Sequence, residues 1–154
     1  MLTDTATQTV EVQAPFEEVL ATLRDVESQP EWIPEILVAE LLEAYEGTEL
    51  PATARFKASA AVGTDEYVLS YRHTDTTMSW TMLEGRLQTG QEGRYQLRRH
   101  GPERTAVTYT LTIHHNLPLP GFLRNRVIKG LVASTLAGLQ RRCSPSRPGR
   151  PATA

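Results

Sequence analysis

The sequence has 154 residues, 40% of them hydrophobic and 22% charged, which suits one folded domain with a single core and excludes a second domain. Its net charge of -2 lacks the basic excess that a phosphate backbone attracts, so nucleic acid is not an expected partner. The single cysteine, Cys143, excludes an internal disulfide.

The first ten residues, MLTDTATQTV, contain neither the basic nor the apolar region of a secretory signal peptide. No run in the sequence approaches the roughly 18 apolar residues of a membrane-spanning helix. We therefore expect a cytoplasmic protein without a transmembrane segment. Composition leaves open whether it is a monomer or a dimer.

The N-terminal third begins with alternating residues at 7–13, which predict a strand that stops before Pro15. The period then changes to that of a helix of about three turns. Its apolar stripe consists of Phe16, Val19, Leu20 and Leu23.

Between residues 36 and 115 the period returns to two, which predicts six antiparallel strands. They are expected at 35–45, 53–61, 65–73, 76–84, 93–99 and 105–115. Turn-like sequences separate them, among them LQTGQEG at 87–93. With the N-terminal strand the sheet has about seven strands.

The C-terminal part predicts a helix over about 120–142, long enough at 1.5 Å per residue to cross the sheet. The predicted fold is α+β, a curved seven-stranded antiparallel sheet wrapped on this helix. We assign residues 1–143 to the domain. The Pro-, Ser- and Arg-rich residues 144–154 are expected to form a disordered tail.

The parity of each predicted strand indicates which side chains face the helix. Apolar Met78, Trp80 and Met82 alternate with small polar residues, so we expect them to point inward. The same test turns a further set inward, consisting of Tyr67, Leu69, Tyr71, Tyr95, Leu97, Val107, Tyr109, Leu111 and Ile113. This inner face is rich in tyrosine, whose hydroxyl needs a polar partner when buried.

The strand at 53–61 carries small residues on its inward parity. Ala54, Ala58 and Ala60 share that parity with Phe56. Alanine fills little volume, so this strand either packs very close to the helix or leaves space. The neighbouring tyrosine hydroxyls favour a cavity.

Several segments together are similar to a known family: DVESQPEWIP, SWTMLEG, the hairpin from EGRYQL to TAVTYTL, and the final helix after NLPLPG. The chain resembles the START/Bet v 1-like (SRPBCC) helix-grip superfamily over about residues 4–142. Within that superfamily it resembles the small actinobacterial polyketide cyclase/dehydrase and lipid-transport proteins.

The resemblance implies two short helices after the first strand and a cavity between the sheet and the last helix. Such cavities bind apolar small molecules, for example lipids, sterols, quinones or polyketides. It does not imply one reaction, because the superfamily includes aromatase/cyclases, coenzyme Q-binding proteins and a ribosome-association toxin.

From the inner face and the resemblance together, we expect a set of ligand-binding side chains. They are Trp32, Phe56, Tyr67, Leu69, Tyr71, Met78, Trp80, Met82, Tyr95, Tyr109, Val127, Leu131 and Thr135. Trp32 lies between Pro30 and Pro34, in the sequence that matches the turn between the two short helices. It is either a plug that stabilises the fold or a wall of the cavity.

Metal and cofactor chemistry find little support in the sequence. His114 and His115 are adjacent on a strand, so their rings point to opposite faces and do not share a metal. There is no G-x-S-x-G motif and no glycine-rich phosphate loop. We expect no metal and no cofactor.

Acid–base residues are the remaining route to catalysis. His73, Glu84 and Arg86 lie at inward or strand-end positions and are candidates for proton transfer in a cavity. Alternatively, Glu84 and Arg86 flank a turn at Gly85 and face solvent.

Three functions therefore remain open: a carrier or sensor of an apolar small molecule, a polyketide aromatase/cyclase or dehydrase, and a ribosome- or protein-interaction module. The third would use a basic outer face formed by Arg55, Lys57, Arg94, Arg98 and Arg99.

Overall fold

The computed structural model describes residues 1–144, which form one antiparallel sheet and three helical segments. The strands are β1 (Leu2–Val12), β2 (Ile36–Ala44), β3 (Pro51–Ala60), β4 (Gly63–His73), β5 (Thr77–Gly85), β6 (Gln88–Gly101) and β7 (Arg104–His115). The helices are α1 (Phe16–Arg24), the 3-10 helix η1 (Val26–Glu31) and α2 (Gly121–Arg142). The predicted α+β fold is confirmed; the predicted tail, apart from Ser144, lies outside the described residues.

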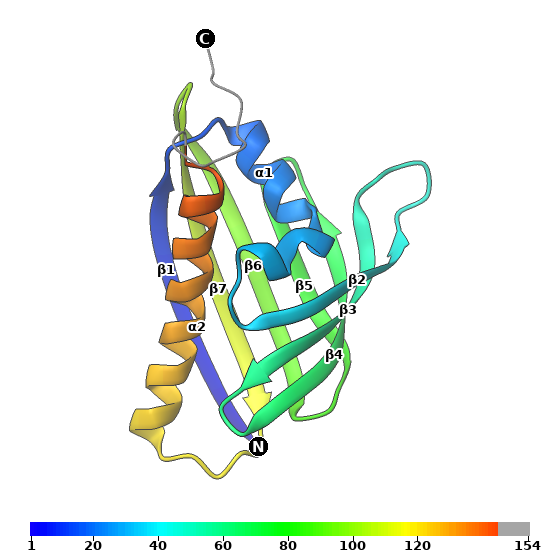
Figure 1. The fold of residues 1–154 in the computed structure, drawn as a ribbon, viewed down its shortest axis with the longest axis vertical. Helices are drawn as coiled ribbons and strands as arrows, with labels where there is room; N and C mark the ends of the chain where they lie inside the picture. The colour runs from blue at the N-terminus through cyan, green and yellow to red at the C-terminus, as the bar shows by residue number, and fades with distance from the viewer. Residues whose placement is uncertain (145–154) are drawn as a thin grey trace.

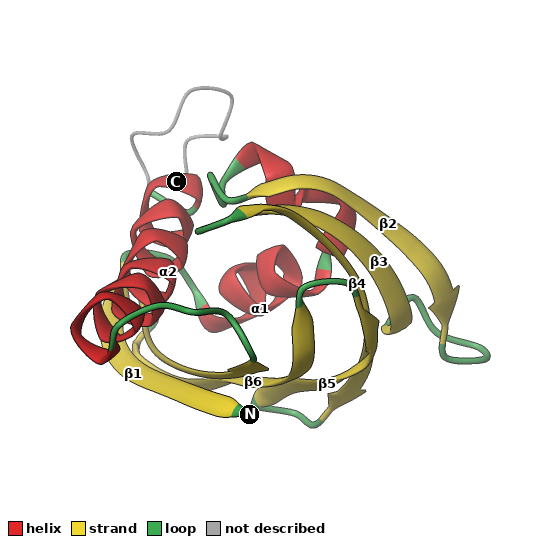
Figure 2. Cartoon of the chain, turned by 90° about the horizontal axis from the view of Figure 1, so that it is seen from below, coloured by secondary structure: helices red, strands yellow, loops and turns green. Residues whose placement is uncertain are grey.

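The strands lie in the order β1-β7-β6-β5-β4-β3-β2, and every neighbouring pair is antiparallel (Figure 1). The sheet curves strongly, so that β2, β3 and β4 stand across from β1 and α2 (Figure 2). α2 packs along β1 and β7, while α1 and η1 lie over one end of the concave face (Figures 1 and 2). None of the helices within residues 1–144 has the length and hydropathy needed to cross a bilayer.

Alternation places the inner face where the sequence predicts it. Phe56 pairs with Tyr67, and Tyr71 with Trp80, across neighbouring strands. All four side chains are buried. The reason is that side chains of a regular strand alternate between faces, so one apolar parity fixes the buried side.

A β-bulge in the β4–β5 pair interrupts this alternation. Leu69 pairs with Met82, but Val68, the residue before Leu69, pairs with Glu84 and not with Leu83. The extra residue, Leu83, is 61% exposed. A bulge shifts parity by one residue, so Glu84 faces outward although its number continues the inward series.

Strand β6 begins at Gln88, five residues before its predicted start, so the expected turn at 87–93 is largely strand. Gly93 looks like a turn residue in the sequence but serves another purpose. The indole of Trp80 occupies the space that a Cβ at position 93 would need. Glycine inside a strand often marks such a close approach.

The N-terminal segments also differ from expectation. β1 begins at Leu2 rather than residue 7 and pairs with β7 up to His115. The sequence around Pro30, expected as the turn between two short helices, is itself the second of them, η1, and Trp32 caps its C-terminus.

The turn after η1 packs directly on α2. The main-chain carbonyl of Trp32 occupies the position where a Cβ at Gly138 would project. Gly138 is therefore required by the close approach of two main chains, a contact that α2's apolar stripe alone does not reveal.

Candidate functional site

A cavity of about 150 Å³ lies between the concave face of the sheet and α2. Its walls come from β3, β4, the β5–β6 hairpin, β7 and α2, together with residues from η1 to the start of β2. The cavity is partly open to solvent, and Ser59, near the β3–β4 turn, is among its lining residues.

Nine of the predicted ligand-binding residues line this cavity: Phe56, Tyr67, Leu69, Tyr71, Trp80, Tyr95, Tyr109, Leu131 and Thr135. Of the small residues on β3, Ala58 and Ala60 line it as well, and Ala54 does not. Four predicted residues lie elsewhere, namely Trp32, Met78, Met82 and Val127.

Aromatic rings form one continuous wall. Trp80 lies at its centre, with ring centroids 5.8 Å from Tyr71, 5.2 Å from Tyr95 and 5.9 Å from Tyr109. Rings at these distances and tilted angles attract each other beyond the effect of burial alone. The shape of the wall is therefore set by the packing of these rings on one another.

The tyrosine hydroxyls in this wall have different partners. Those of Tyr95 and Tyr109 lie beside each other, and that of Tyr71 lies beside the side chain of Gln29. The Tyr67 hydroxyl has no partner among the described residues. Burial raises the pKa of all four tyrosines above the usual range.

A chain of side-chain hydrogen bonds runs along the floor of the cavity. Trp80 Nε1 donates to Gln91 Oε1 at 2.8 Å, and Gln91 Nε2 donates to Gln88 Oε1 at 2.8 Å. Gln88 Nε2 in turn donates to Asp65 Oδ2 at 2.9 Å. The chain fixes the Trp80 ring in orientation, because each amide is held at both ends.

Asp65 ends this chain and also holds the β5–β6 turn. Its Oδ1 accepts the main-chain N–H groups of Glu66, Arg86 and Leu87, at 2.9, 3.2 and 2.8 Å. The side chain is almost completely buried. A carboxylate bound by this many N–H groups is a structural anchor with no free lone pair for proton transfer.

Glu35 is a different kind of carboxylate. It precedes β2, is half-buried and lines the cavity. Its Oε1 accepts the hydroxyl of Ser134 on α2 at 3.0 Å. No second partner exists for Glu35 Oε2 within the part of the chain that the structure describes. This carboxylate is therefore open to a ligand.

His115 lines the cavity but both its ring nitrogens are engaged. Nδ1 accepts the N–H of Leu117 at 3.1 Å, so the proton lies on Nε2, which donates to Asp4 Oδ2 at 2.6 Å. Arg124 approaches the other oxygen of Asp4 at 3.6 Å. This chain ties β1, β7 and α2 together at the end of the sheet.

The predicted acid–base residues do not gather at the cavity. Glu84 and Arg86 are exposed on the outer side of the sheet, Glu84 because of the β-bulge. His73 donates through Nε2 to the carbonyl of Pro51 at 2.8 Å and packs against the ring of Tyr71. Burial lowers the pKa of His73, but the ring lies outside the cavity.

Trp32 lies outside the cavity too. Its ring is 6% exposed, and Nε1 donates to the hydroxyl of Ser28 at 3.4 Å. Since its carbonyl rests on Gly138, the residue fixes η1 against α2.

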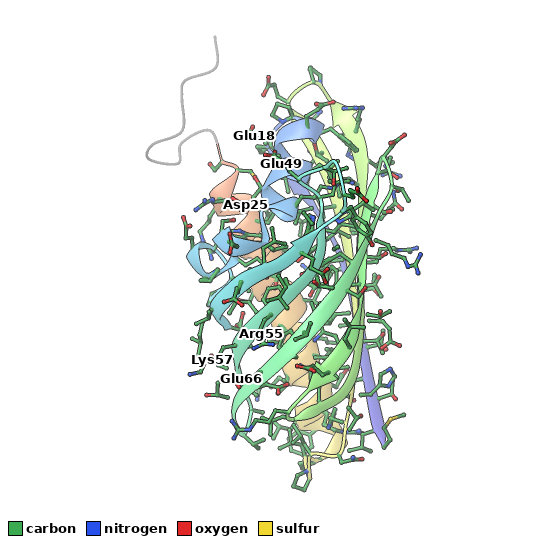
Figure 3. The ribbon with its side chains drawn as sticks, turned by 90° about the vertical axis from the view of Figure 1, so that its right-hand side faces the viewer. Glu18, Asp25, Glu49, Arg55, Lys57 and Glu66 are labelled. Atoms are coloured by element: carbon green, nitrogen blue, oxygen red, sulfur yellow. The ribbon has the colours of Figure 1, made fainter. Side chains whose placement is uncertain are left out.

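The basic residues that were predicted to form one outer face do not all lie on it. Arg99 pairs with Glu17 at 2.8 Å on α1, away from the outer face. Lys57 lies opposite Glu66 on the neighbouring strand, close to Arg55 (Figure 3). Acidic and basic groups thus alternate there. Within residues 1–144 no group of three or more His, Cys, Asp or Glu is placed to hold a metal ion.

Residues 3–144 match the family described as polyketide cyclase/dehydrase and lipid transport. The chain belongs to this family. The match covers nearly the whole of the described structure, including every element that lines the cavity.

Solved structures agree with this membership in fold. A START superfamily protein from Mycobacterium smegmatis has a TM-score of 0.83 and 23% identity, covering 90% of this chain and 96% of that one. The Zhui aromatase/cyclase from Streptomyces sp. R1128 has a TM-score of 0.78 and 16% identity, covering 96% and 98%. The protein TTHA0849 from Thermus thermophilus has a TM-score of 0.74 and 25% identity, covering 90% and 96%. No curated protein matches the sequence.

The family cavity in this chain contains polar residues that the sequence did not single out. Asp65 and His115 continue the inward parity of their strands by one further alternation, so parity could have identified them. Gln91 was hidden in the apparent turn. Glu35 and Gln29 lie outside regular strands, and no periodic signal marks them.

Proposed function

We propose that this protein is a carrier or sensor that binds an apolar small molecule, such as a lipid, quinone or polyketide-like compound, without covalent chemistry. The cytoplasm is the proposed location. The observation that supports this most directly is the cavity behind the aromatic wall, where Ala58 and Ala60 replace larger side chains. Concave apolar sites with a few polar groups are the usual form of small-molecule sites.

The size of the cavity bears on the ligand. A cavity of about 150 Å³ lined mainly by apolar and aromatic side chains is large enough for a benzene-sized ring. Because the cavity is partly open to solvent, a longer molecule can place one ring inside and extend outward.

The test is native mass spectrometry of the protein purified from its own host or from a lipid-rich extract, followed by denaturing extraction. A stoichiometric apolar compound is the expected result. A protein that is empty and ignores a broad panel of apolar ligands would contradict the proposal.

A variant pair locates the binding site. In Ala58→Trp the indole fills the cavity, so ligand uptake should be lost while the fold persists. Lys57→Trp is the matched control, because Lys57 is the neighbour of Ala58 on β3 and its side chain is exposed on the opposite face of the sheet. Uptake by Ala58→Trp equal to that of the control would place the site elsewhere.

A second function, aromatase/cyclase or dehydrase, is favoured by one observation. Glu35 places a carboxylate with a free oxygen at the cavity, where it can accept a proton from a substrate. Turnover of a polyketide-like substrate that is abolished in Glu35→Gln, with binding retained, would support it. Binding without turnover supports the carrier.

A further inference from the structure

The charged side chains in the cavity wall are all acidic. Of the side chains lining it within residues 1–144, Glu35 and Asp65 are carboxylic acids, and none is lysine or arginine. Carboxyl groups are ionised at neutral pH in most settings. A ligand entering this cavity therefore meets negative charge and no compensating cation.

The cations nearest the cavity are engaged elsewhere. Arg124 pairs with Asp4 and does not line the cavity. His115 carries its single proton on Nε2, where Asp4 accepts it. Neither residue offers a positive charge to a bound anion.

The other donors in the cavity wall are neutral hydroxyl and amide groups. The Tyr95 and Tyr109 hydroxyls lie beside each other, and the Tyr71 hydroxyl lies beside the side chain of Gln29. The amides of Gln88 and Gln91 donate within the chain that ends at Asp65. The hydroxyls of Tyr67 and Thr135 have no hydrogen-bond partner among the described residues, but neutral donors carry no charge and do not offset two carboxylates in a site of low dielectric.

Glu35 instead offers an acceptor. Ser134 occupies Oε1, and Oε2 has no partner among the described residues. By contrast, Asp65 is surrounded by N–H groups. Of the two carboxylates, Glu35 is the one that can receive a hydrogen bond from a ligand.

We infer that the cavity selects apolar ring compounds carrying a hydroxyl donor and rejects their carboxylates, with Glu35 as the residue that makes this distinction. The inference rests on the proposed function and narrows its ligand class to phenol-like rings, excluding free fatty acids and aromatic acids. A hydrogen bond from a neutral hydroxyl to an ionised carboxylate is charge-assisted and therefore stronger than a hydrogen bond between two neutral groups.

Equilibrium dialysis at neutral pH with three probes of one shape tests it: naphthalene, 2-naphthol and 2-naphthoate. The hydroxyl compound should bind about tenfold or more tightly than the carboxylate, with naphthalene between them. In Glu35→Gln the amide oxygen still accepts from Ser134, but the charge is gone. The ratio of the two dissociation constants should then fall to within about threefold.

Two further variants act as controls. Glu40→Gln removes an exposed carboxylate from β2 and should leave the ratio unchanged. Ser134→Ala removes the hydrogen bond to Glu35 but keeps the charge, so discrimination should persist. Circular dichroism confirms that each variant is folded.

The outcomes separate this inference from the proposed function. If the wild-type protein binds naphthalene but binds naphthoate as tightly as naphthol, or if Glu35→Gln leaves the ratio unchanged, the inference is wrong and the proposed function stands. If none of the three probes binds to the wild-type protein, the inference is wrong, and the broad panel of apolar ligands decides the proposed function.

Discussion

The two ends of the concave face use the same sheet and the same helix, yet one is filled and the other is hollow. At the filled end α1 and the C-terminal half of α2 insert Leu23, Leu136 and Leu139, each with no exposed surface. At the hollow end β3 presents Ala58 and Ala60, and α2 presents Leu131, which is only half-buried.

This difference shows that the fold does not by itself decide whether there is a cavity. Interiors are packed as densely as organic crystals wherever side chains can reach one another. The hollow end escapes that rule because small residues stand on β3 while the aromatic wall is held back by its own ring contacts and by the hydrogen-bond chain to Asp65.

The largest expected effect concerns alkaline pH and the tyrosines of the hollow end. Their pKa values are raised by burial, so above pH 10 the unfolded chain loses protons that the folded chain keeps. The stability they contribute is complete below pH 10 and is lost as pH rises. Each tyrosine lowers the free energy of unfolding by about 1.4 kcal/mol per pH unit, or about 6 kcal/mol for the four near pH 11.

The measurement is tyrosinate absorbance followed together with far-UV circular dichroism. The ionisation of these four tyrosines should coincide with unfolding. Ionisation of any of these four tyrosines before the fold is lost would mean that water reaches the aromatic wall freely.

A matched pair of leucine truncations on α2 compares the ends directly. Leu136→Ala leaves a void in the filled end and should cost about 3–4 kcal/mol of unfolding free energy. Leu131→Ala only widens an existing cavity, so it should cost about 1 kcal/mol. Urea unfolding measures both, and equal losses would mean that the two ends are equally packed.

The polar floor of the hollow end is tested at Asp65. Asp65→Ala leaves buried N–H groups of the β5–β6 turn and of Gln88 without an acceptor, which should cost about 2–3 kcal/mol. Asp65→Asn retains one acceptor oxygen and should lose less. Near-UV circular dichroism should report a reoriented Trp80 in the alanine variant, and an unchanged signal would contradict the proposed coupling.

The smallest effect separates two glycines of α2. Gly138→Ala places a methyl group on the Trp32 carbonyl and should cost about 2 kcal/mol in spite of alanine's better helix propensity. Gly130→Ala meets no atom within 4 Å and should stabilise by about 0.5–1 kcal/mol. Thermal unfolding compares them, and the same shift in both variants would show that the approach of η1 to α2 is not tight.

The sequence by itself determined the fold class, the element order and most of the aromatic wall. Phe56, Tyr71 and Trp80 could be placed on the inner face because strand parity is a local property, readable from neighbouring residues. The apolar stripe of the last helix is local in the same sense, and it predicted a helix that the structure has at Gly121–Arg142.

Only the tertiary structure decided which residues face the cavity at its polar end. Glu84 leaves the inner face because of a bulge whose position depends on pairing between two strands. Glu35 reaches the cavity because Trp32, in the turn after η1, packs on Gly138, and because Ser134 lies opposite; these contacts join residues about 100 positions apart. Such long-range pairings leave no periodic trace in the sequence, since each partner alone looks like an ordinary helix or turn residue.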